Sequence, residues 1–502
     1  MPILTLITLT PLAGAIAIAA IPGRETDLIR RTALGFALAA WVMSLGLLAA
    51  FALGPVGFQF NEALDWIPSF GIQYKVGVDG LSVLMVVLTT TLTWISILAS
   101  FKITDRVKGY MISFLILEVG MIGVFIALDL FLFYIFWEIV LVPMYLIIGI
   151  WGGANRIYAT MKFVLYTLVG SLLMLIAILA TAYSYQVGHN GSWIGAFDYQ
   201  ALQGWAAGGH FGDTFQLIAF LALFLAFAIK VPMFPFHTWL PDAHTEAPTA
   251  GSVILAGVLL KLGAYGLIRF AVPLYPHAAH QLAGPIIVLS VIAIVYGAIV
   301  SIVQTDLKRL VAYSSVSHMG FVTLGIFAFS ASALQGAILQ MINHGLITGG
   351  LFLLVGVIYE RTHDRTIAKM GGLAAIMPIY CTIFGFFILA SAGLPGLSGF
   401  VGEFLVFVGS FGVAPVIAVA SIIVMVLAAT YLLWMFQRVA LGELSDFLRG
   451  LGGHLTEINR TEIVTLAPLA VMIVVLGLFP SLVLDLLRAP TQVFLTAVGM
   501  GG

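Results

Sequence analysis

Charged residues are scarce in this chain of 502 residues: Asp, Glu, Lys and Arg together make up 9% of it, whereas 61% of its residues are hydrophobic. Soluble globular proteins carry about 25% charged residues. So few charges would leave most of the folded surface apolar, which excludes a soluble enzyme, and the high hydrophobic content excludes a disordered chain. The scarcity predicts a polytopic integral membrane protein whose outer surface faces lipid.

Cysteine and net charge are scarce as well. The single cysteine, Cys381, lies in an apolar run and cannot form an internal disulfide, which excludes a disulfide scaffold. The formal net charge of −1 leaves no excess of basic residues for nucleic acid. The sequence also lacks a Gly-rich nucleotide loop after a strand, a Cys cluster and a haem motif. We therefore expect this chain to bind no cofactor and no nucleic acid.

Long apolar runs are what the chain has in abundance. A spanning helix needs about 20 mostly apolar residues, and fourteen runs approach or exceed that length: 2–21, 32–53, 80–100, 109–127, 130–151, 160–185, 214–240, 248–272, 282–303, 307–328, 333–358, 373–410, 414–437 and 462–484. The run 373–410 is too long for one simple span, so we expect it to be bent or broken. The pattern predicts an all-α fold with fourteen transmembrane helices.

The basic residues indicate the orientation of these helices, because inner loops are enriched in Lys and Arg. If the N-terminus lies outside, the outer segments hold only Lys75 and Arg488, and Lys230, Lys261 and Arg269 fall inside apolar runs. The other 16 of the 21 then lie at the inner face: Arg24, Arg30, Arg31, Lys102, Arg106, Lys108, Arg156, Lys162, Lys308, Arg309, Arg361, Arg365, Lys369, Arg438, Arg449 and Arg460. This split predicts that both termini lie on the outside.

Four charged residues lie in the middle of apolar runs: Glu138, Lys230, Lys261 and Glu403. A charge at the centre of an isolated spanning helix costs about 2.5–3.5 kcal/mol. We therefore expect all four to face the interior of the bundle, where they are paired with one another or hydrated.

Other titratable residues accompany them. His318 and His344 lie inside the tenth and eleventh runs, Glu118 lies near the middle of the fourth, and Asp129 begins the fifth, where a helix cap is favoured over a relay. One buried pair would be read as structural, but a series on six spans indicates that ions move along it. Because an ammonium group repels Na⁺ and K⁺, a lysine-lined path favours protons.

Two of the charges stand beside helix breakers. Lys230 precedes Pro232 and Pro235, and Glu403 follows the segment Gly393–Gly399, which includes Pro395. Proline removes a helical hydrogen bond and clashes one turn back, and paired interruptions in corresponding positions of two halves indicate a transport site. We therefore expect one broken helix in 214–240 and another in 373–410.

The two breaks indicate an internal repeat. Spans four to eight cover 109–272 and spans nine to thirteen cover 282–437, so each unit contains five helices. Because five is odd, a repeated unit must be inverted in the membrane. The expected organisation is three N-terminal helices (1–108), two inverted five-helix repeats, and a loop with a C-terminal helix and tail (438–502).

The segment PFHTWLPDAHTEAPT, residues 235–249, contains His237, Asp242, His244 and Glu246. Their spacing matches no zinc motif, and the segment follows the first helix break. Proton uptake or a structural cap is favoured over a metal site, and we expect the chain to hold no metal.

These residues carry a close resemblance to a known family. The stretch from Lys230 through PFHTWLPDAHTEAPT to SVILAGVLLKLGAYG resembles the antiporter-like subunits of respiratory complex I and of multisubunit Na⁺/H⁺ antiporters. The motifs SSVSHMG, NHG and GLPGLSGFVGEF extend the resemblance, which is clearest over residues 70–440. The residue at the second break is a glutamate rather than a lysine. In this respect the sequence resembles the M-type chain (chain 4) and not its L-type and N-type relatives.

The resemblance implies a role for each of the buried residues. It implies that Glu138 pairs with Lys230, that Lys261 connects the halves, and that Glu403 is the terminal site towards the outside. The implied proton relay is Glu138, Lys230, Lys261, His318, His344 and Glu403. Candidate uptake or tuning residues are Glu118, Asp129 and His237.

The resemblance also implies a setting. The chain would translocate protons as a membrane-arm subunit of NADH:quinone oxidoreductase in an energy-transducing inner membrane, most simply the bacterial plasma membrane. FMN, iron–sulfur clusters and quinone would bind to other subunits, and L-type and N-type chains would be its neighbours. Two alternatives stay open: a subunit of a multisubunit Na⁺/H⁺ antiporter, and a scaffold whose buried charges are structural.

Overall fold

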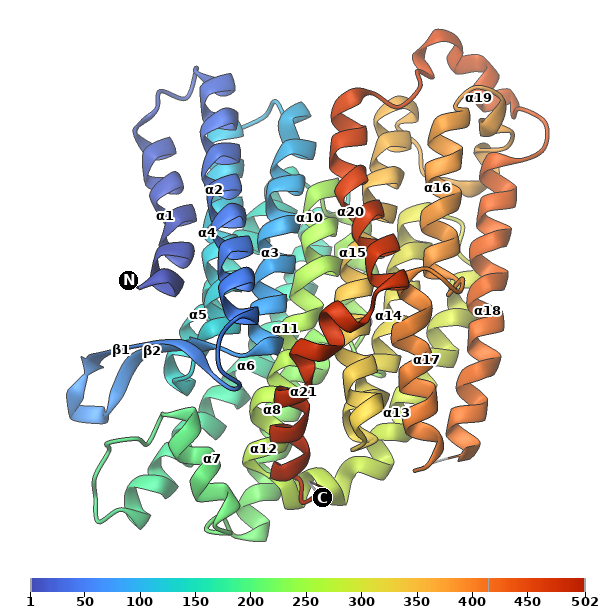
Figure 1. Ribbon diagram of the computed structural model, residues 1–502. Coiled ribbons are helices and arrows are strands. Elements are labelled where there is room, and N and C mark those ends of the chain that lie inside the picture. Colours follow the sequence, from blue (N-terminus) through green and yellow to red (C-terminus); the bar gives the residue numbers. More distant parts are fainter. Residues whose placement is uncertain (1, 414, 501–502) are drawn as a thin grey trace.

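The computed structural model of the protein describes residues 2–413 and 415–500 as a bundle of helices that stand side by side (Figure 1). The N-terminal part contains three long helices and one hairpin, namely α1 (Ile3–Ala20), α2 (Thr26–Ala52), β1 (Gln59–Ile67), β2 (Ile72–Val78) and α3 (Gly80–Ala99). The two strands are antiparallel, with Leu64 opposite Tyr74. The hairpin projects from the end of the bundle at which α1 begins (Figure 1).

The middle of the chain contains the first predicted repeat. Its elements are α4 (Val107–Ile126), α5 (Leu130–Trp151), α6 (Arg156–Gly188), α7 (Tyr199–Ala207), α8 (Asp213–Lys230), α9 (Trp239–Glu246), α10 (Thr249–Ile254), α11 (Leu260–Gly266) and α12 (Val272–Leu274). Two π-helical segments, Leu255–Leu259 and Leu267–Ala271, join α10, α11 and α12 into one continuous helical stretch. As predicted from the prolines, α8 ends at Lys230 and helix resumes only at Trp239.

The last third of the chain contains the second predicted repeat and the C-terminal helices. These are α13 (Pro276–Ile302), α14 (Leu307–Phe327), α15 (Ala331–Thr362), α16 (Pro378–Ser391), α17 (Ser398–Phe411), α18 (Pro415–Ala440), α19 (Asp446–Leu451), α20 (Arg460–Leu478) and α21 (Ser481–Ala497). The run 373–410 is divided into α16 and α17, each of 14 residues, at the predicted Gly/Pro segment.

Twelve helical stretches of the described chain are long and apolar enough to cross a membrane, and each coincides with one predicted run. The remaining two runs correspond to the α16–α17 pair and to α18. The predicted helical membrane fold is therefore confirmed, with the β1–β2 hairpin as an addition to it.

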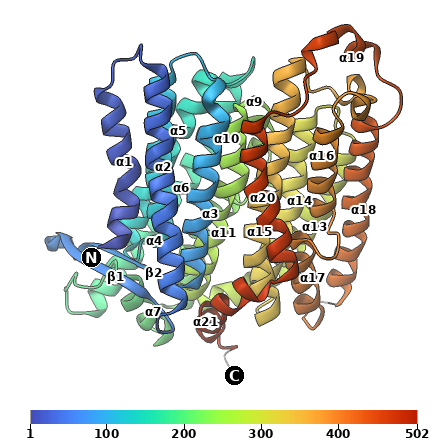
Figure 2. The same ribbon diagram turned by 45° about the horizontal axis from the view of Figure 1, so that its top comes forward.

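Several elements lie wholly or mostly outside the predicted spans: the hairpin, α7, α9, α19 and the C-terminal helix α21. The predicted run 462–484 is wrong at its end, because α20 stops at Leu478 and a separate helix begins at Ser481. Pro480 explains the boundary, since proline restricts the residue before it and cannot donate a helical hydrogen bond. In Figures 1 and 2, α21 crosses the lower end of the bundle at an angle to the long helices.

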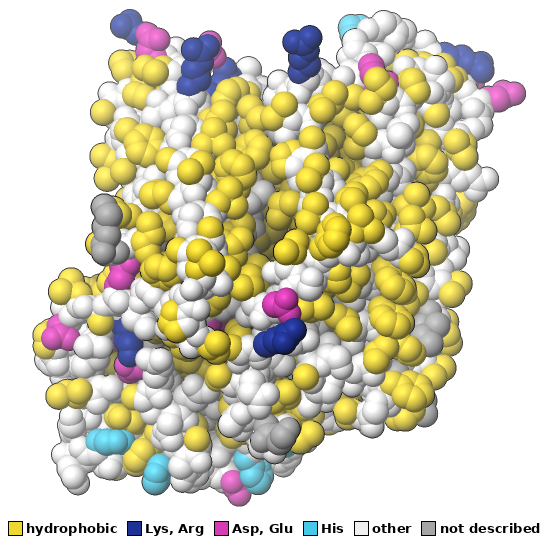
Figure 3. Space-filling model, viewed as in Figure 1, with side chains coloured by type: hydrophobic (Ala, Val, Ile, Leu, Met, Phe, Trp, Pro, Cys, Tyr) yellow, Lys and Arg dark blue, Asp and Glu magenta, His cyan; other side chains and the backbone are white. Residues whose placement is uncertain are grey.

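The centre of the bundle is formed by α3, the α10–α12 stretch, α14 and α15, whose side chains are almost all buried by other parts of the same chain. The outer helices α1, α2, α13 and α20 keep apolar side chains exposed. Figure 3 shows hydrophobic side chains over the middle of one face, with Lys and Arg along its upper edge. Because Lys261, His318 and His344 lie on the central helices, they are shielded from the surroundings of the bundle on all sides.

Candidate functional site

The structure brings four of the six predicted relay residues into one buried series. His318 of α14 and Glu403 of α17 are joined by a 2.6 Å contact between Nδ1 and Oε1. The same carboxylate oxygen accepts a hydrogen bond of 2.9 Å from Nε2 of Gln340 on α15. On its other side, the His318 ring contacts the Ser391 hydroxyl at 3.3 Å. Glu403, whose charge would be costly in an apolar setting, is thus bound by polar side chains.

Glycines around the second break leave the space that the close packing of α17 requires. A Cβ at Gly399 would collide with the carbonyl oxygen of Ala390, and a Cβ at Gly402 would lie 2.7 Å from Oε1 of Gln340. The first turn of α17 is also held from α15, because Nδ2 of Asn343 donates to the carbonyl of Ser398 at 2.6 Å. The break therefore places Glu403 against α15 with little freedom to move.

Lys261 begins the series on the eighth predicted span. Its ammonium group contacts Nδ1 of His344 at 2.7 Å and also donates to the carbonyl of Ala256. Both residues are at least 98% buried. The π-helical segments flank Lys261 on both sides, and π-bulges are frequent at functional sites because they release backbone groups from the regular helical ladder.

One gap separates the two halves of this series. The ring centroids of His318 and His344 are 6.0 Å apart, too far for a direct hydrogen bond. A cavity of about 10 Å³ lies beside both rings and is lined also by Gln340, Ser391 and Gly399. Its size is close to the space that a single water molecule requires.

The other two predicted relay residues, Glu138 and Lys230, are arranged differently. The Lys230 ammonium lies over the rings of Trp137 and Phe163, with 5.5 Å and 5.4 Å to their centroids. No ion pair within 4.0 Å joins it to Glu138 or to another carboxylate of the described residues, so the direct pair implied by the resemblance is not formed in this structure. Aromatic faces attract a cation at about this distance, which explains how the buried ammonium is held.

The backbone nevertheless links Lys230 to Lys261. A Cβ at Gly263 would lie 2.6 Å from the carbonyl of Phe227 and 3.0 Å from the amide nitrogen of Val231. The end of α8 therefore packs directly on α11, two residues beyond Lys261. This close approach joins the first broken helix to the centre of the bundle.

The three candidate tuning residues occupy separate places. Glu118 of α4 is fully buried, and neither of its carboxylate oxygens has a partner among the described residues. His237 is also buried and packs its ring on Tyr296 with centroids 5.0 Å apart. The structure does not bring either residue into the bonded series.

Asp129 lies between α4 and α5 and caps α5. One carboxylate oxygen accepts from the amides of Phe131 and Leu132, and the other accepts from the amide of Gln73 on the hairpin. Burial raises the pKa of the Asp129 carboxyl to about 6, although these three amides act in the opposite direction. Asp129 thus connects the start of α5 to the hairpin.

A cavity of about 430 Å³ opens at the Lys/Arg-rich end of the bundle. Glu246, Lys308 and Arg365 line it, and the buried Lys308 ammonium donates to the carbonyl of Ala247. His244 lies close by, fully buried, with its ring stacked on Phe352 at 4.6 Å. Residues from α9, α14 and the loop after α15 therefore form a polar recess at this end.

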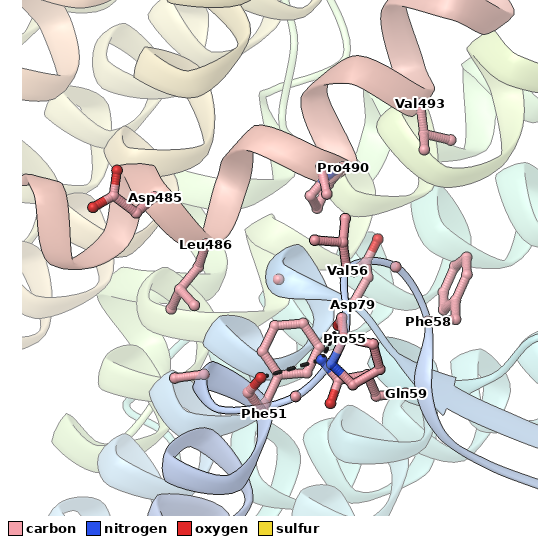
Figure 4. Close-up of a pocket in the computed structure, with 15 residues that line it drawn as sticks. Phe51, Pro55, Val56, Phe58, Gln59, Asp79, Asp485, Leu486, Pro490 and Val493 are labelled. Atoms are coloured by element: carbon pink, nitrogen blue, oxygen red, sulfur yellow. Dashed lines mark hydrogen bonds between the residues drawn. The ribbon is translucent and has the colours of Figure 1, made fainter.

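A further buried ion pair lies at the opposite end of the eighth predicted span. Arg269 Nη2 contacts Asp79 Oδ1 at 2.6 Å, and its guanidinium packs over Phe58 at 4.9 Å. Asp79 also lines a cavity of about 180 Å³ together with Leu486 and Pro490 of α21, and Figure 4 shows these side chains around it. This pair ties the start of α3 to the central helix that carries Lys261.

Sequence reasoning assigned no site role to several of these polar residues, namely Ser391, Gln340, Asn343, Lys308 and the Asp79–Arg269 pair. A signal was present for two of them, because Gln340, Asn343 and His344 are spaced to share one face of a helix. The described residues include no group of three or more His, Cys, Asp or Glu side chains placed to hold a metal ion.

Comparison with known proteins agrees with this architecture. Over residues 127–430 the chain matches the family described as NADH:quinone oxidoreductase/Mrp antiporter, TM. The NADH-quinone oxidoreductase subunit M of Rhodobacter capsulatus is 47% identical over 501 residues, covering 97% of this chain and 94% of the relative. The NADH-ubiquinone oxidoreductase chain 4 of Marchantia polymorpha is 43% identical, covering 95% of this chain and 94% of the relative.

Solved structures give the same result. A chain of respiratory complex I from Thermus thermophilus superimposes with a TM-score of 0.87 at 30% identity, covering 99% of this chain and 100% of the other. A chain of the Mrp complex from Dietzia sp. shares the fold with a TM-score of 0.84 at 20% identity, with both chains fully covered. The chain therefore belongs to the NADH:quinone oxidoreductase/Mrp antiporter membrane family, among the relatives named subunit M or chain 4.

Proposed function

We propose that this protein is a proton-translocating membrane-arm subunit of NADH:quinone oxidoreductase (respiratory complex I). The observation that carries the proposal is the buried series Lys261, His344, His318 and Glu403, in which neighbouring groups are hydrogen-bonded or separated by a cavity of about the size of one water molecule. Each of these groups can bind and release a proton. A structural role would need one compensated pair, not a series that extends through three central elements to the second broken helix.

The proposed route begins at the polar recess beside Lys308 and Glu246, at the face that we take as the inner one. His244 lies between this recess and the centre of the bundle, and Lys261 receives protons there. His344 and His318 pass them to Glu403, which we take as the terminal site towards the outside. Glu138 and Lys230 change the electrostatic surroundings of Lys261, because the end of α8 that carries Lys230 packs on α11. Glu118, Asp129 and His237 lie outside this series as candidate uptake or tuning groups, and Asp129 also caps α5.

The energy demand of this route is modest. Moving one elementary charge across 100 mV takes about 2.3 kcal/mol. A change of about two units in the pKa of one group corresponds to about 2.7 kcal/mol. Small movements of a broken helix that bring a charged group closer or move it away are therefore sufficient to drive a proton step.

The chain crosses the membrane in a defined topology in this proposal. All fourteen helical runs cross the membrane, with α16 and α17 together forming one span and both termini on the outside. Residues 109–272 and 282–437 form two inverted repeats between the N-terminal part (1–108) and the C-terminal part (438–502). The two breaks, each next to a buried charge, support this organisation.

Redox chemistry is assigned to other subunits. NADH oxidation, FMN, the iron–sulfur clusters and quinone reduction would be located there, and L-type and N-type antiporter-like chains would flank this one in the bacterial plasma membrane. The names and near full-length coverage of the relatives support complex I over the alternative of a multisubunit Na⁺/H⁺ antiporter. Purification of the tagged chain from its native membrane separates the two. Co-purifying flavin and iron–sulfur absorbance is expected, and its absence would favour the antiporter.

Substitutions of Glu138 and Lys230 test the role of these two residues in pumping. Glu138→Gln and Lys230→Ala are each expected to abolish NADH-driven proton pumping in vesicles while the complex stays assembled on native gels. Arg449→Gln, a change at an exposed residue of the inner face, is the control and should leave pumping unchanged. An assembled Lys230→Ala complex with normal pumping would support the scaffold alternative.

A further inference from the structure

A groove lies on the outside of the bundle where α3, α15 and α20 meet at their Lys/Arg-rich ends. Its volume is about 560 Å³, and its walls include Leu98, Phe101, Leu353 and Val357. The neighbouring surface of α20 is apolar and exposed, with Val464 50% exposed. These helix ends lie close together in Figures 1 and 2. If α20 crosses the membrane as proposed, a groove in this surface faces the hydrocarbon of the inner leaflet.

The rim of the groove carries charges of both signs. Lys102 contacts Glu360 and, at 2.8 Å, Glu462, and Arg361 contacts Glu462 at 2.9 Å. These four charges compensate one another. Arg460 also lines the rim, and among the described residues its guanidinium makes no ion pair or side-chain hydrogen bond. The rim therefore offers one free guanidinium group.

Hydrogen-bonding capacity is also left on the paired groups. The Lys102 ammonium has three donors, and two of them are directed to Glu360 and Glu462. Only Oε2 of Glu360 is bonded to Lys102, and this side chain is 34% exposed. The rim thus offers a cationic site for a phosphate and, beside it, a carboxylate oxygen for an ammonium group.

The depth of the groove suits a lipid. Val357 and Leu353 precede Glu360 by three and seven residues on α15, which places them about 4.5 Å and 10 Å deeper along the helix axis. An acyl chain whose headgroup lies at Glu360 and Arg460 would pass along both. We propose that this groove binds one phosphatidylethanolamine molecule of the inner leaflet, with its phosphate on Arg460 and Lys102 and its ammonium on Glu360.

The site adjoins the polar recess at Lys308. Thr249 and Gly356 line both cavities, and a Cβ at Gly356 would collide with the Thr249 side chain. The contact between Thr249 and Gly356 therefore lies where the groove and the recess adjoin. Lipid binding here rests on the proposed membrane topology and not on proton pumping.

Photo-crosslinking of the intact complex tests this proposal. The complex is reconstituted with phosphatidylethanolamine that carries a photoactivatable diazirine in the upper part of one acyl chain, and adducts are mapped by mass spectrometry. Adducts on residues 98–102, 353–357 and 459–465 are expected to exceed those on the exposed face of α2 several-fold. Phosphatidylglycerol with the same diazirine, which lacks the ammonium group, is expected to label the groove less.

Two variants should lower the phosphatidylethanolamine adducts in the groove several-fold. Arg460→Gln removes the free cation at an exposed position, so folding is not at risk, and Ala99→Trp fills the groove. The matched controls are Arg449→Gln, at an exposed arginine elsewhere on the inner face, and Ala39→Trp, on the exposed face of α2. Three results would overturn the proposal. They are equal labelling of the groove by the two lipids, no enrichment of adducts in the groove over the face of α2, and crosslinks that show a neighbouring protein chain in the groove.

Discussion

At the scale of single residues, Glu403 is the most constrained titratable group of the series. Its Oε1 accepts from Gln340 and contacts Nδ1 of His318, so a proton moving between the imidazole and the carboxylate would travel along an existing hydrogen bond. Charge-assisted hydrogen bonds of this kind are short and strong. An amide in place of the carboxylate would fill the same space but would not accept a proton.

Glu403→Gln is therefore expected to lower NADH-driven proton pumping by about tenfold or more, while NADH-to-quinone electron transfer in uncoupled membranes falls less. Tenfold corresponds to about 1.4 kcal/mol on one transfer step. Pumping would be followed by the quenching of a pH-sensitive dye in inverted vesicles. Glu443→Gln, at an exposed glutamate after α18, is the control. Full pumping by the Glu403→Gln complex would show that protons leave by another group.

Residue-scale prediction from the sequence succeeded where a charge interrupts an apolar run and failed where the polar group is neutral. Lys261 and Glu403 are conspicuous in their runs, and the structure places both inside the bundle. Gln340 and Ser391 are tolerated in many helices, so their types alone give no signal. Their importance comes from contacts across helices more than 60 residues apart in sequence, which one sequence does not contain.

At the scale of elements, both broken helices were predictable because proline and glycine act locally. The π-helical segments around Lys261 were not predictable, since they arise from packing of the central stretch among its neighbours. The hairpin and α21 were missed for a related reason. Neither contains a long apolar run, and each is stabilised by contacts with other elements at one end of the bundle.

The packing of α17 on α16 rests on Gly399. Gly399→Val would drive a side chain into the carbonyl of Ala390, and overpacking of this kind typically costs about 1–3 kcal/mol. We expect a lower midpoint of thermal unfolding for the purified complex, together with reduced pumping, because Glu403 is displaced. Gly412→Val at the end of the same helix meets nothing within 4 Å and should leave both unchanged. Equal midpoints for the two variants would contradict the packing argument.

Variants of Asp129 distinguish a helix cap from a proton-relay residue. Asp129→Ala removes the acceptor for the first amides of α5 and for Gln73, and loss of such a cap costs about 0.5–2 kcal/mol. Asp129→Asn keeps one acceptor oxygen and should lose less thermal stability. Asp65→Ala on the exposed part of the hairpin is the control. A cap predicts that pumping by Asp129→Asn is close to normal. If both Asp129 variants stop pumping with unchanged stability, the carboxylate carries protons.

At the scale of the whole molecule, the arrangement of basic residues and the broken run 373–410 decide the topology together. If α16 and α17 form one span, Ala368 before them and Glu443 after α18 lie on the inner side, whereas Gly412 between α17 and α18 lies on the outer side. If the pair instead enters and leaves by the same face, Gly412 lies on the same side as Ala368. The two topologies therefore place both Gly412 and Glu443, which are exposed, on opposite sides of the membrane.

Cysteine labelling distinguishes them with little background, because the single native cysteine, Cys381, is buried. Ala368→Cys, Gly412→Cys and Glu443→Cys would each be reacted with a membrane-impermeant maleimide in right-side-out and in inverted vesicles, with the unsubstituted chain as control. We expect Gly412→Cys to react only in right-side-out vesicles and the other two only in inverted vesicles. Because a helix that crosses once must change sides, reaction of Gly412→Cys in inverted vesicles would reduce the number of spans and reverse the orientation of every element after α17.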